Sequence, residues 1–218
     1  MYNKVSVPKS QGIAPGAAAA KDPNVTIVDV DDILLFPPRD SKGIVMVGSF
    51  AMRPGFKMIQ FYATKSKISA PYTSDGDEDS ISIKQAFEAQ HPGNAKEIRE
   101  FIQNWLGRNV IIIHGSCAEP EKQVVGTKCA PLQLKPEGKD DNDGRMHMLK
   151  FEAFAKSSFL PGIYNGPLVL DAPTAVADVA EVTIDTEVNT QYKLPVGTTG
   201  TGASVSFDAV TASDREHI

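Results

Sequence analysis

A single amphipathic helical pattern stands inside a chain whose other apolar runs are typical of strands, and this contrast limits the fold more than any other feature. Pro92 and Gly93 interrupt the strand pattern ahead of it, and Asn94 is a residue type that caps helix starts. Glu97 stands three residues later, as in a capping box, and Gly107 supplies a stop. The pattern predicts a helix over residues 95–106.

One face of this predicted helix is apolar. Its residues recur at i, i+3, i+4 and i+7, which places them on a single stripe. They are Ile98, Phe101, Ile102 and Trp105. The stripe predicts a face packed on the protein core, and a face packed on another subunit is the alternative interpretation.

Around the helix, apolar and β-branched residues alternate or run together as they do in strands. A tight turn at Pro54-Gly55 separates two of these runs. The runs are 25–36, 43–50, 56–64, 110–114, 123–134 and 145–154. The sequence therefore predicts a mainly β protein with one amphipathic α-helix.

A strand pattern also resumes at Ile81, Ile83 and Phe87, after the polar segment that follows residues 56–64. These two strands predict a hairpin with a long, charged tip. The charged side chains of the tip include Lys65, Lys67, Asp75, Asp77 and Asp79.

The acids of residues 75–79 alternate with other residues, as at the first three ligand positions of a calcium-binding EF-hand loop. The sixth position is Ser80 where that loop needs glycine, and the twelfth is Ala86 where it needs a bidentate glutamate. We therefore interpret the segment as a solvated turn, with a cation site as the alternative. A second acidic run, residues 140–144, is interpreted in the same way.

Cys117 and Cys129 are the two cysteines of the chain. A turn near Pro120 would place them about six residues apart along the hairpin that follows the helix, or roughly 20 Å at the strand rise. That separation is too great for a disulfide, and it weakens a zinc site built from His114 and the two cysteines. We expect free, inert cysteines.

No local motif predicts catalysis. The glycine-rich run at 197–202 lacks the lysine of a phosphate-binding loop and the helix that follows one. The chain contains neither a Gly-x-Ser-x-Gly nor a His-Glu-x-x-His motif. Each of the four scattered histidines is expected to be structural or solvated: His91, His114, His147 and His217. We expect a protein that is not an enzyme and binds no cofactor or metal.

Charge divides the chain unevenly. The whole carries a net charge of −5, whereas residues 167–218 hold eight acidic and two basic residues, a net charge of −6. Residues 1–23 are rich in small residues and predict an extended arm, which is either a disordered start or an arm that orders on a neighbouring subunit. We expect three parts: this arm, a domain over 24–166, and an acidic, β-rich segment or small domain over 167–218 with short strands at 179–184 and 204–210.

The acidic balance argues against tight binding to nucleic acid, which usually requires a basic face. The sequence shows no signal-peptide pattern and no apolar window of the ~20 residues that a membrane span needs. We expect a protein that is soluble where it is made and has no membrane partner.

Several short phrases resemble, in their order, the tail tube proteins of double-stranded DNA bacteriophages. They are residues 56–62, the Asp75-Gly76-Asp77 turn, residues 87–93 ahead of the helix, residues 110–113 and Gly126. The resemblance covers residues 24–166. It implies a β-sandwich or barrel-like domain with a long hairpin, whose copies join edge to edge into hexameric rings that stack into a conduit for the phage genome.

The resemblance also implies that the charged hairpin tip reaches the next ring, where Lys65, Lys67, Asp75, Asp77 and Asp79 would make salt-sensitive contacts between subunits. The partners would be other copies of the chain and other phage tail or head proteins, with genomic DNA as non-specific passing cargo. The protein would be assembled in the host cytoplasm and located in the virion.

Two other functions stay open. A capsid decoration or head auxiliary protein would use its arm and acidic segment to clamp neighbouring shell subunits. A β-rich ligand-binding or enzymatic domain would need a concave pocket with convergent polar groups.

Overall fold

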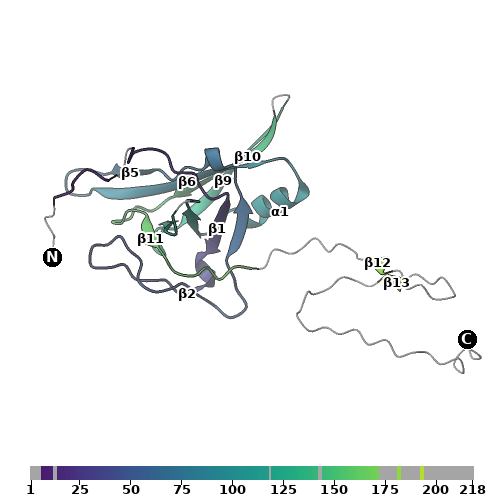
Figure 1. Cartoon of the computed structure of the whole chain (residues 1–218), viewed down its shortest axis with the longest axis horizontal. Coiled ribbons are helices and arrows are strands. Elements are labelled where there is room, and N and C mark those ends of the chain that lie inside the picture. The colour runs from purple at the N-terminus through teal and green to yellow at the C-terminus, as the bar shows by residue number, and fades with distance from the viewer. Residues whose placement is uncertain are drawn as a thin grey trace, which may run out of the picture. The chain divides into compact units, whose positions relative to one another are not determined.

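The computed structural model of the protein has two compact units, Met1–Asp171 and Ala172–Ile218. It describes residues 6–11, 14–117, 119–141 and 144–171, and in the second unit only the paired backbone of 181–182 and 192–193. The described residues form a large antiparallel sheet and one α-helix (Figure 1). The prediction of a mainly β protein with one α-helix is confirmed.

The first unit extends to Asp171, beyond the predicted boundary at residue 166. The Met58 N–H donates to the Val169 carbonyl at 2.8 Å, and the Asp171 N–H donates to the Met58 carbonyl at 2.8 Å. These bonds hold the start of the predicted acidic segment against the first unit. The second unit therefore begins after Asp171.

The main sheet has nine strands, and all its strand pairings are antiparallel. Its main path runs β11-β8-β7-β9-β10-β6-β5, and β1 joins β4 to β7. The strands are β1 (Asn24–Asp29), β4 (Ile59–Tyr62), β5 (Tyr72–Asp75), β6 (Ser82–Pro92), β7 (Val110–Gly115), β8 (Lys122–Val125), β9 (Leu132–Asp141), β10 (Gly144–Ala153) and β11 (Gly162–Tyr164). Outside it, β2 (Ile33–Leu35) pairs with β3 (Ala51–Met52).

Strand β7 is buried on both faces. Val110 and Ile112 belong to one core cluster, and Ile111 and Ile113 belong to the other. The alternation follows from the pleat, in which successive side chains point to opposite faces. A strand covered on both faces has no polar side to show, which explains why this run is continuously apolar.

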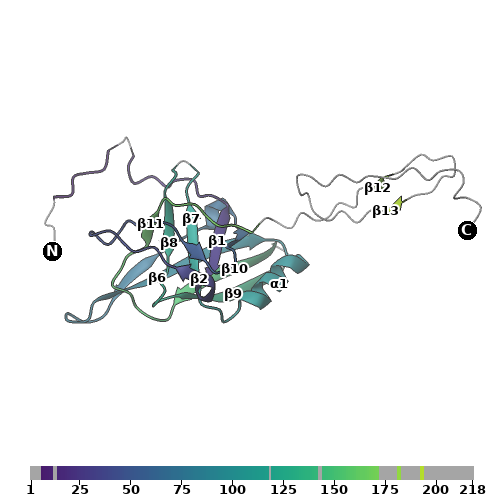
Figure 2. The same cartoon turned by 90° about the horizontal axis from the view of Figure 1, so that it is seen from below.

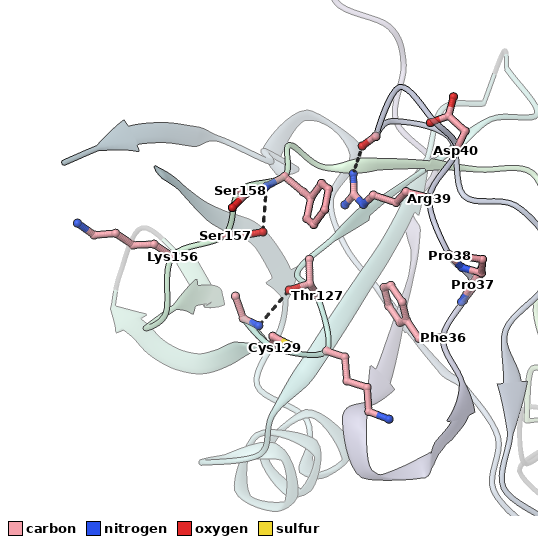
Figure 3. Close-up of a pocket in the computed structure, with 14 residues that line it drawn as sticks. Phe36, Pro37, Pro38, Arg39, Asp40, Thr127, Cys129, Lys156, Ser157 and Ser158 are labelled. Atoms are coloured by element: carbon pink, nitrogen blue, oxygen red, sulfur yellow. Dashed lines mark hydrogen bonds between the residues drawn. The ribbon is translucent and has the colours of Figure 1, made fainter. Parts of the chain in front are cut away.

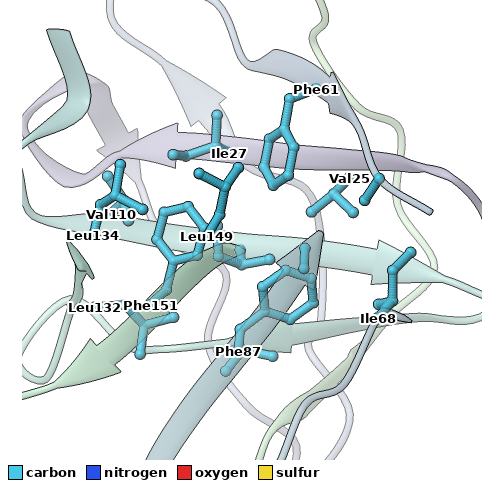
Figure 4. Close-up of a cluster of buried hydrophobic side chains, with 14 of the residues drawn as sticks. Val25, Ile27, Phe61, Ile68, Phe87, Val110, Leu132, Leu134, Leu149 and Phe151 are labelled. Carbon is cyan, nitrogen blue, oxygen red and sulfur yellow. The ribbon is translucent and has the colours of Figure 1, made fainter. Parts of the chain in front are cut away.

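The first core cluster lies between strands that face one another across it (Figure 4). Phe61, Phe87 and Phe151 form its aromatic part. The ring centroids of Phe61 and Phe151 are 6.1 Å apart, and those of Phe87 and Phe151 are 6.2 Å apart. These separations are typical of favourable aromatic pairs.

Helix α1 (Lys96–Trp105) lays its apolar stripe on the first cluster. Ile98 is buried, and Phe101, Ile102 and Trp105 are partly buried against the cluster. The ring of Phe101 lies 5.4 Å from that of Phe61. The stripe therefore faces the protein's own core.

The predicted capping of this helix by Asn94 is wrong. Ala95 is the N-cap residue, and no side chain caps it. Asn94 instead donates through Nδ2 to Asp140 Oδ2 at 3.0 Å, and its Oδ1 accepts from Arg99 Nε at 2.7 Å and lies 3.1 Å from His147 Nε2. The Asn94 side chain does not cap the helix because it is bound by Asp140 and His147 of the β9–β10 hairpin and by Arg99 of the helix.

The predicted strand over residues 25–36 is interrupted. A 3-10 turn, η1 (Val30–Asp32), separates β1 from β2. Asp29 Oδ1 accepts the Asp31 N–H at 3.0 Å, which stabilises the turn. Apolar periodicity alone carried no signal of this break.

The predicted strand over residues 43–50 is wrong. The segment makes only single bridges to other parts of the chain, such as that between Val45 and Ile163. Met46 and Phe50 are buried in the second core cluster. The run is apolar because it covers the outer face of β1 and β7, and not because it is a strand.

The predicted strand over residues 123–134 is two strands, β8 and β9. Gly126 lies between them with a φ of +94°, a conformation that glycine adopts readily. Its N–H donates to Gln85 Oε1 at 2.8 Å. Before this glycine, β8 pairs with β7 and β11; after it, β9 pairs with β10.

Some predictions fall outside the described residues. They are the glycine-rich turn at 197–202, the strand at 204–210, His217 and residues 142–143 of the second acidic turn. Within the predicted strand 179–184, the backbone of β12 (Glu181–Val182) pairs with β13 (Tyr192–Lys193).

Candidate inter-subunit surfaces

The charged hairpin is formed by β5 and β6, and not by β4 and β6 as the sequence predicted. Tyr72 lies opposite Gln85, and Asp75 lies opposite Ser82. The chain before β5 also follows β6, because the Thr64 N–H donates to the carbonyl of Gln90 at 2.8 Å. Strand β4 pairs with β1, and only the residues that follow it reach β6.

The tip of the hairpin is the loop of residues 76–81, which contains a hydrogen-bonded turn over residues 77–80. The Ser80 N–H donates to the Asp77 carbonyl at 2.9 Å, and the Asp77 N–H donates to Ser80 Oγ at 3.1 Å. Gly76 has a φ of +125°, and a Cβ there would clash with the Ser80 carbonyl. All residues from 71 to 81 are exposed, and the hairpin projects from the body of the unit in both views (Figures 1 and 2).

The structure brings the three predicted acids together at this end of the hairpin. Asp75 Oδ2 lies 3.0 Å from Lys156 Nζ, and this contact lowers the pKa of the Asp75 carboxyl. Asp77 and Asp79 lie in the turn and form no ion pair within the described part of the chain.

The predicted placement of Lys65 and Lys67 at the tip is wrong. Both lie in a second 3-10 turn, η2 (Lys65–Lys67). This turn comes directly after Thr64, whose N–H is bonded to the carbonyl of Gln90 in β6. Because this segment runs antiparallel to β6, its early residues lie at the base of the hairpin and its late residues at the tip. The lysines are therefore separated from the acids by most of the hairpin's length.

Strand β5 has an open edge. Its four residues are all exposed, and its only strand partner in the described ranges is β6. At the other end of the sheet path, β11 is covered, because the Met46 N–H donates to the Ile163 carbonyl at 2.8 Å. The open edge thus lies on the same element as the acidic turn.

A cavity of about 560 Å³ opens between three loops of the first unit (Figure 3). Its walls combine aromatic and proline side chains with cations and hydroxyl groups. The loops that line it are residues 36–40 with Gly43, residues 127–130, and residues 156–159. Its volume is within the range of ligand pockets, about 300–1,000 Å³.

Arg39 is the most unusual side chain of this pocket. Its Nη1 donates to the Gly43 carbonyl at 2.9 Å, and its guanidinium lies 4.8 Å from the ring centroid of Phe159. Its Nη2 is buried and has no hydrogen-bond partner. Burial lowers the pKa of the guanidinium, and the nearby Asp40 carboxylate opposes that change.

Asp40 does not neutralise Arg39 by direct contact. Its Oδ1 accepts the N–H groups of Ile44 at 2.9 Å and Val45 at 3.1 Å. These bonds, the first above all, lower the pKa of the Asp40 carboxyl. The pocket wall therefore holds a cation whose buried Nη2 has no partner, beside an Asp40 carboxylate that already accepts backbone N–H groups.

His114 is a second buried polar group that the sequence did not single out as unusual. Its side chain is 3% exposed, and neither ring nitrogen has a hydrogen-bond partner. Burial, aided by the charge of Lys21, lowers its pKa to about 4. The ring lies 5.2 Å from that of Phe87, so at neutral pH it is an uncharged part of the core.

The N-terminal arm is attached next to His114. The Asp22 N–H donates to the Gly115 carbonyl at 3.0 Å, and the Cys117 N–H donates to the Ala20 carbonyl at 2.9 Å. The described residues before Ala20 are all exposed. The arm thus leaves the body at the end of β7.

Both cysteines are free and exposed. Gly115 lies opposite Lys122 in the β7–β8 hairpin, and Cys129 lies outside that hairpin, in the loop before β9. Cys129 lines the pocket of Arg39. Within the described residues, no three His, Cys, Asp or Glu side chains lie close enough to hold a metal ion.

No helix in the described residues is long and apolar enough to cross a membrane. No protein-family model, curated protein or solved structure matches the chain.

Sequence reasoning missed Arg39 as a pocket residue, and it expected His114 to be structural or solvated without predicting its deep burial. Arg39 carried no signal, because an arginine after two prolines is ordinary in a surface loop. His114 had a weak one: it ends a run of four apolar residues and so continues a buried strand.

Proposed function

We propose that the protein is a structural virion protein, the tail tube subunit of a double-stranded DNA bacteriophage. Copies would assemble into stacked, hexameric rings that form the conduit for genome delivery. The observation that carries the proposal is the β5–β6 hairpin, which is exposed throughout its outer part and leaves one edge of β5 unpaired. An unpaired edge is a template for pairing with another chain.

A barrel-like first unit is part of this proposal. Strands β4, β1, β7, β9, β10 and β6 are successive neighbours. Thr64 follows β4, and its N–H donates to Gln90 of β6 at 2.8 Å, which links the two ends of that series. A nearly closed series leaves few free edges, so pairing between copies would be confined to the projecting hairpin.

The charge distribution also supports a conduit. The whole chain carries −5 and the segment 167–218 carries −6, so residues 1–166 carry a net charge of +1 and are near neutrality. A lumen without a basic lining would let DNA pass without strong, salt-dependent binding.

Self-assembly tests the proposal. We expect the purified full-length protein to form tubes or stacked rings in negative-stain electron microscopy at low salt. Light scattering should fall as salt rises, because contacts between exposed charges are screened. Discrete monomers or trimers at every protein and salt concentration would contradict the proposal.

The exposed arm favours a second function, that of a capsid decoration or head auxiliary protein. The arm is hydrogen-bonded to the body near Ala20 and Asp22 and exposed before them, as a clamp on a neighbouring shell subunit would be. This function predicts that purified capsids lacking the protein bind it, whereas the protein alone stays unassembled.

A further inference from the structure

The first unit carries an acidic projection whose charges are unmatched. The turn of the β5–β6 hairpin presents Asp77, Glu78 and Asp79, and none of them forms an ion pair within the described residues. Ile81 follows them and is 66% exposed. The turn therefore combines three free carboxylates with one free apolar side chain.

The walls of the Arg39 pocket carry positive charge, opposite in sign to the charge of the turn. Arg39 has a buried Nη2 without a partner, and Lys128 is exposed and has no ion pair in the described part of the chain. Phe36 and Phe159 add aromatic surface to the same walls. The positive charges of Arg39 and Lys128 make these walls complementary to a surface that carries carboxylates.

The hairpin does not fill the pocket of its own chain. Lys156, at the rim of the pocket, already binds Asp75 at the start of the turn. Beyond that contact, residues 76–81 are all exposed, so they do not pack on their own unit. The turn is left free for a different copy.

Two other projecting parts of the chain match the pocket less well. At the end of the β9–β10 hairpin, Arg145 pairs with Asp140 at 2.9 Å and Lys139 pairs with Asp141 at 2.8 Å. The N-terminal arm over residues 6–20 contains one lysine and no acid. In their described residues, neither of these two projections offers a carboxylate without an ion pair, whereas the β5–β6 turn does.

We propose that the β5–β6 turn of one copy docks into the Arg39 pocket of a second copy. Ile81 would lie against Phe36 and Phe159, and the acids of residues 77–79 would face Arg39 and Lys128. This inference rests on the proposed self-assembly and names the surface that receives the hairpin. Because the turn and the pocket are different surfaces, the contact is heterologous and repeats from copy to copy, as a ring or filament requires.

Cysteine cross-linking tests the docking directly, because Cys129 already lines the pocket. The full-length variant carries Glu78→Cys with Cys117→Ser, so that only positions 78 and 129 are thiols. A disulfide needs Cα atoms about 4.4–6.8 Å apart, so bonds form only where the turn reaches the pocket. On mild oxidation we expect a ladder of dimers, trimers and larger species on a non-reducing gel.

Two matched variants control this experiment. Adding Cys129→Ser should leave dimers at most, because position 78 can then pair only with itself. Placing the new cysteine at Gln103, on the exposed face of α1, should give no ladder with Cys129. A ladder that persists without Cys129 contradicts the docking.

Charge exchange gives a second readout. We expect Glu78→Lys or Lys128→Glu to raise the protein concentration needed for assembly about tenfold at low salt, and the double variant to restore it. Tubes without a ladder and without this restoration overturn the docking but leave the tube function standing. A ladder without tubes supports the docking and overturns the tube, and the absence of ladder and assembly together overturns both.

Discussion

Strands β7 and β5 belong to the same sheet but have opposite surroundings. Strand β7 pairs with neighbours on both edges and buries both faces in the two core clusters. Strand β5 pairs on one edge and exposes all four residues. The comparison indicates that stability is concentrated in β7, whereas β5 is free to serve contact, because its side chains contribute little to folding.

The largest effect should come from a cavity in β7. Ile112→Ala should lower the free energy of unfolding by about 2–5 kcal/mol, since it removes a fully buried side chain from the first cluster. The matched change in β5, Tyr72→Ala, should alter it by less than about 0.5 kcal/mol. Urea unfolding of dilute protein, followed by the fluorescence of Trp105, measures both. Equal losses would refute the division between the two strands.

The next effect is a pH dependence centred on the end of β7. His114 has a pKa of about 4 in the folded state and 6.5 in its ordinary state, so the unfolded chain binds the proton first as pH falls. Stability should be complete above pH 6.5 and decline toward pH 4, by about 3 kcal/mol. His114→Leu should flatten this part of the curve. His91→Gln should retain it, and an unchanged curve in the Leu variant would contradict the assignment.

A smaller effect should come from the buried link between β6 and the loop after β8. Gln85 donates through Nε2 to the Phe159 carbonyl at 2.7 Å, and its Oε1 accepts the Gly126 N–H at 2.8 Å. Gln85→Ala leaves both groups without these partners and should cost about 1–3 kcal/mol. The exposed Gln123→Ala is the control, with an expected change within about 0.5 kcal/mol. Thermal or urea unfolding distinguishes them.

The smallest effect on stability should be found at the hairpin tip, where the effect on assembly is expected to be greatest. Asp77→Asn with Asp79→Asn should leave the free energy of unfolding within about 0.5 kcal/mol of the wild type. Light scattering should show weaker assembly at low salt. Lys65→Gln with Lys67→Gln, at the base of the hairpin, should leave assembly unchanged. The reverse ranking would show that the base, and not the tip, makes the contact.

Sequence reasoning succeeded where a pattern depends on neighbours along the chain. The stripe of α1 and the burial of Ile98 follow from helical spacing, and the continuous apolar run of β7 follows from burial on both faces. It was wrong where a local signal competed with a distant partner. Asn94 is a good capping residue, yet Asp140 and Arg99 bind its side chain.

The candidate inter-subunit surface also had one feature that the sequence predicted and one that it did not. Hydrophilic residues between two strand patterns indicated an exposed acidic turn, and the turn is exposed. The partner of β6 was not predictable, because both 56–64 and 64–75 could have paired with it by their composition. Because residues 64–75 and not 56–64 run along β6, Lys65 and Lys67 lie at the base of the hairpin and not at its tip.

The sequence by itself determined the mainly β class, the single helix with its inward face, and the acidity of the turn, because each is set by composition or by spacing over a few residues. Tertiary structure alone decided which strands pair, that residues 43–50 cover a core, and that Arg39 lies in a pocket with a free donor. Those outcomes depend on contacts between groups that are far apart in the chain. A local sequence pattern does not show which of several possible distant partners gives the lowest free energy.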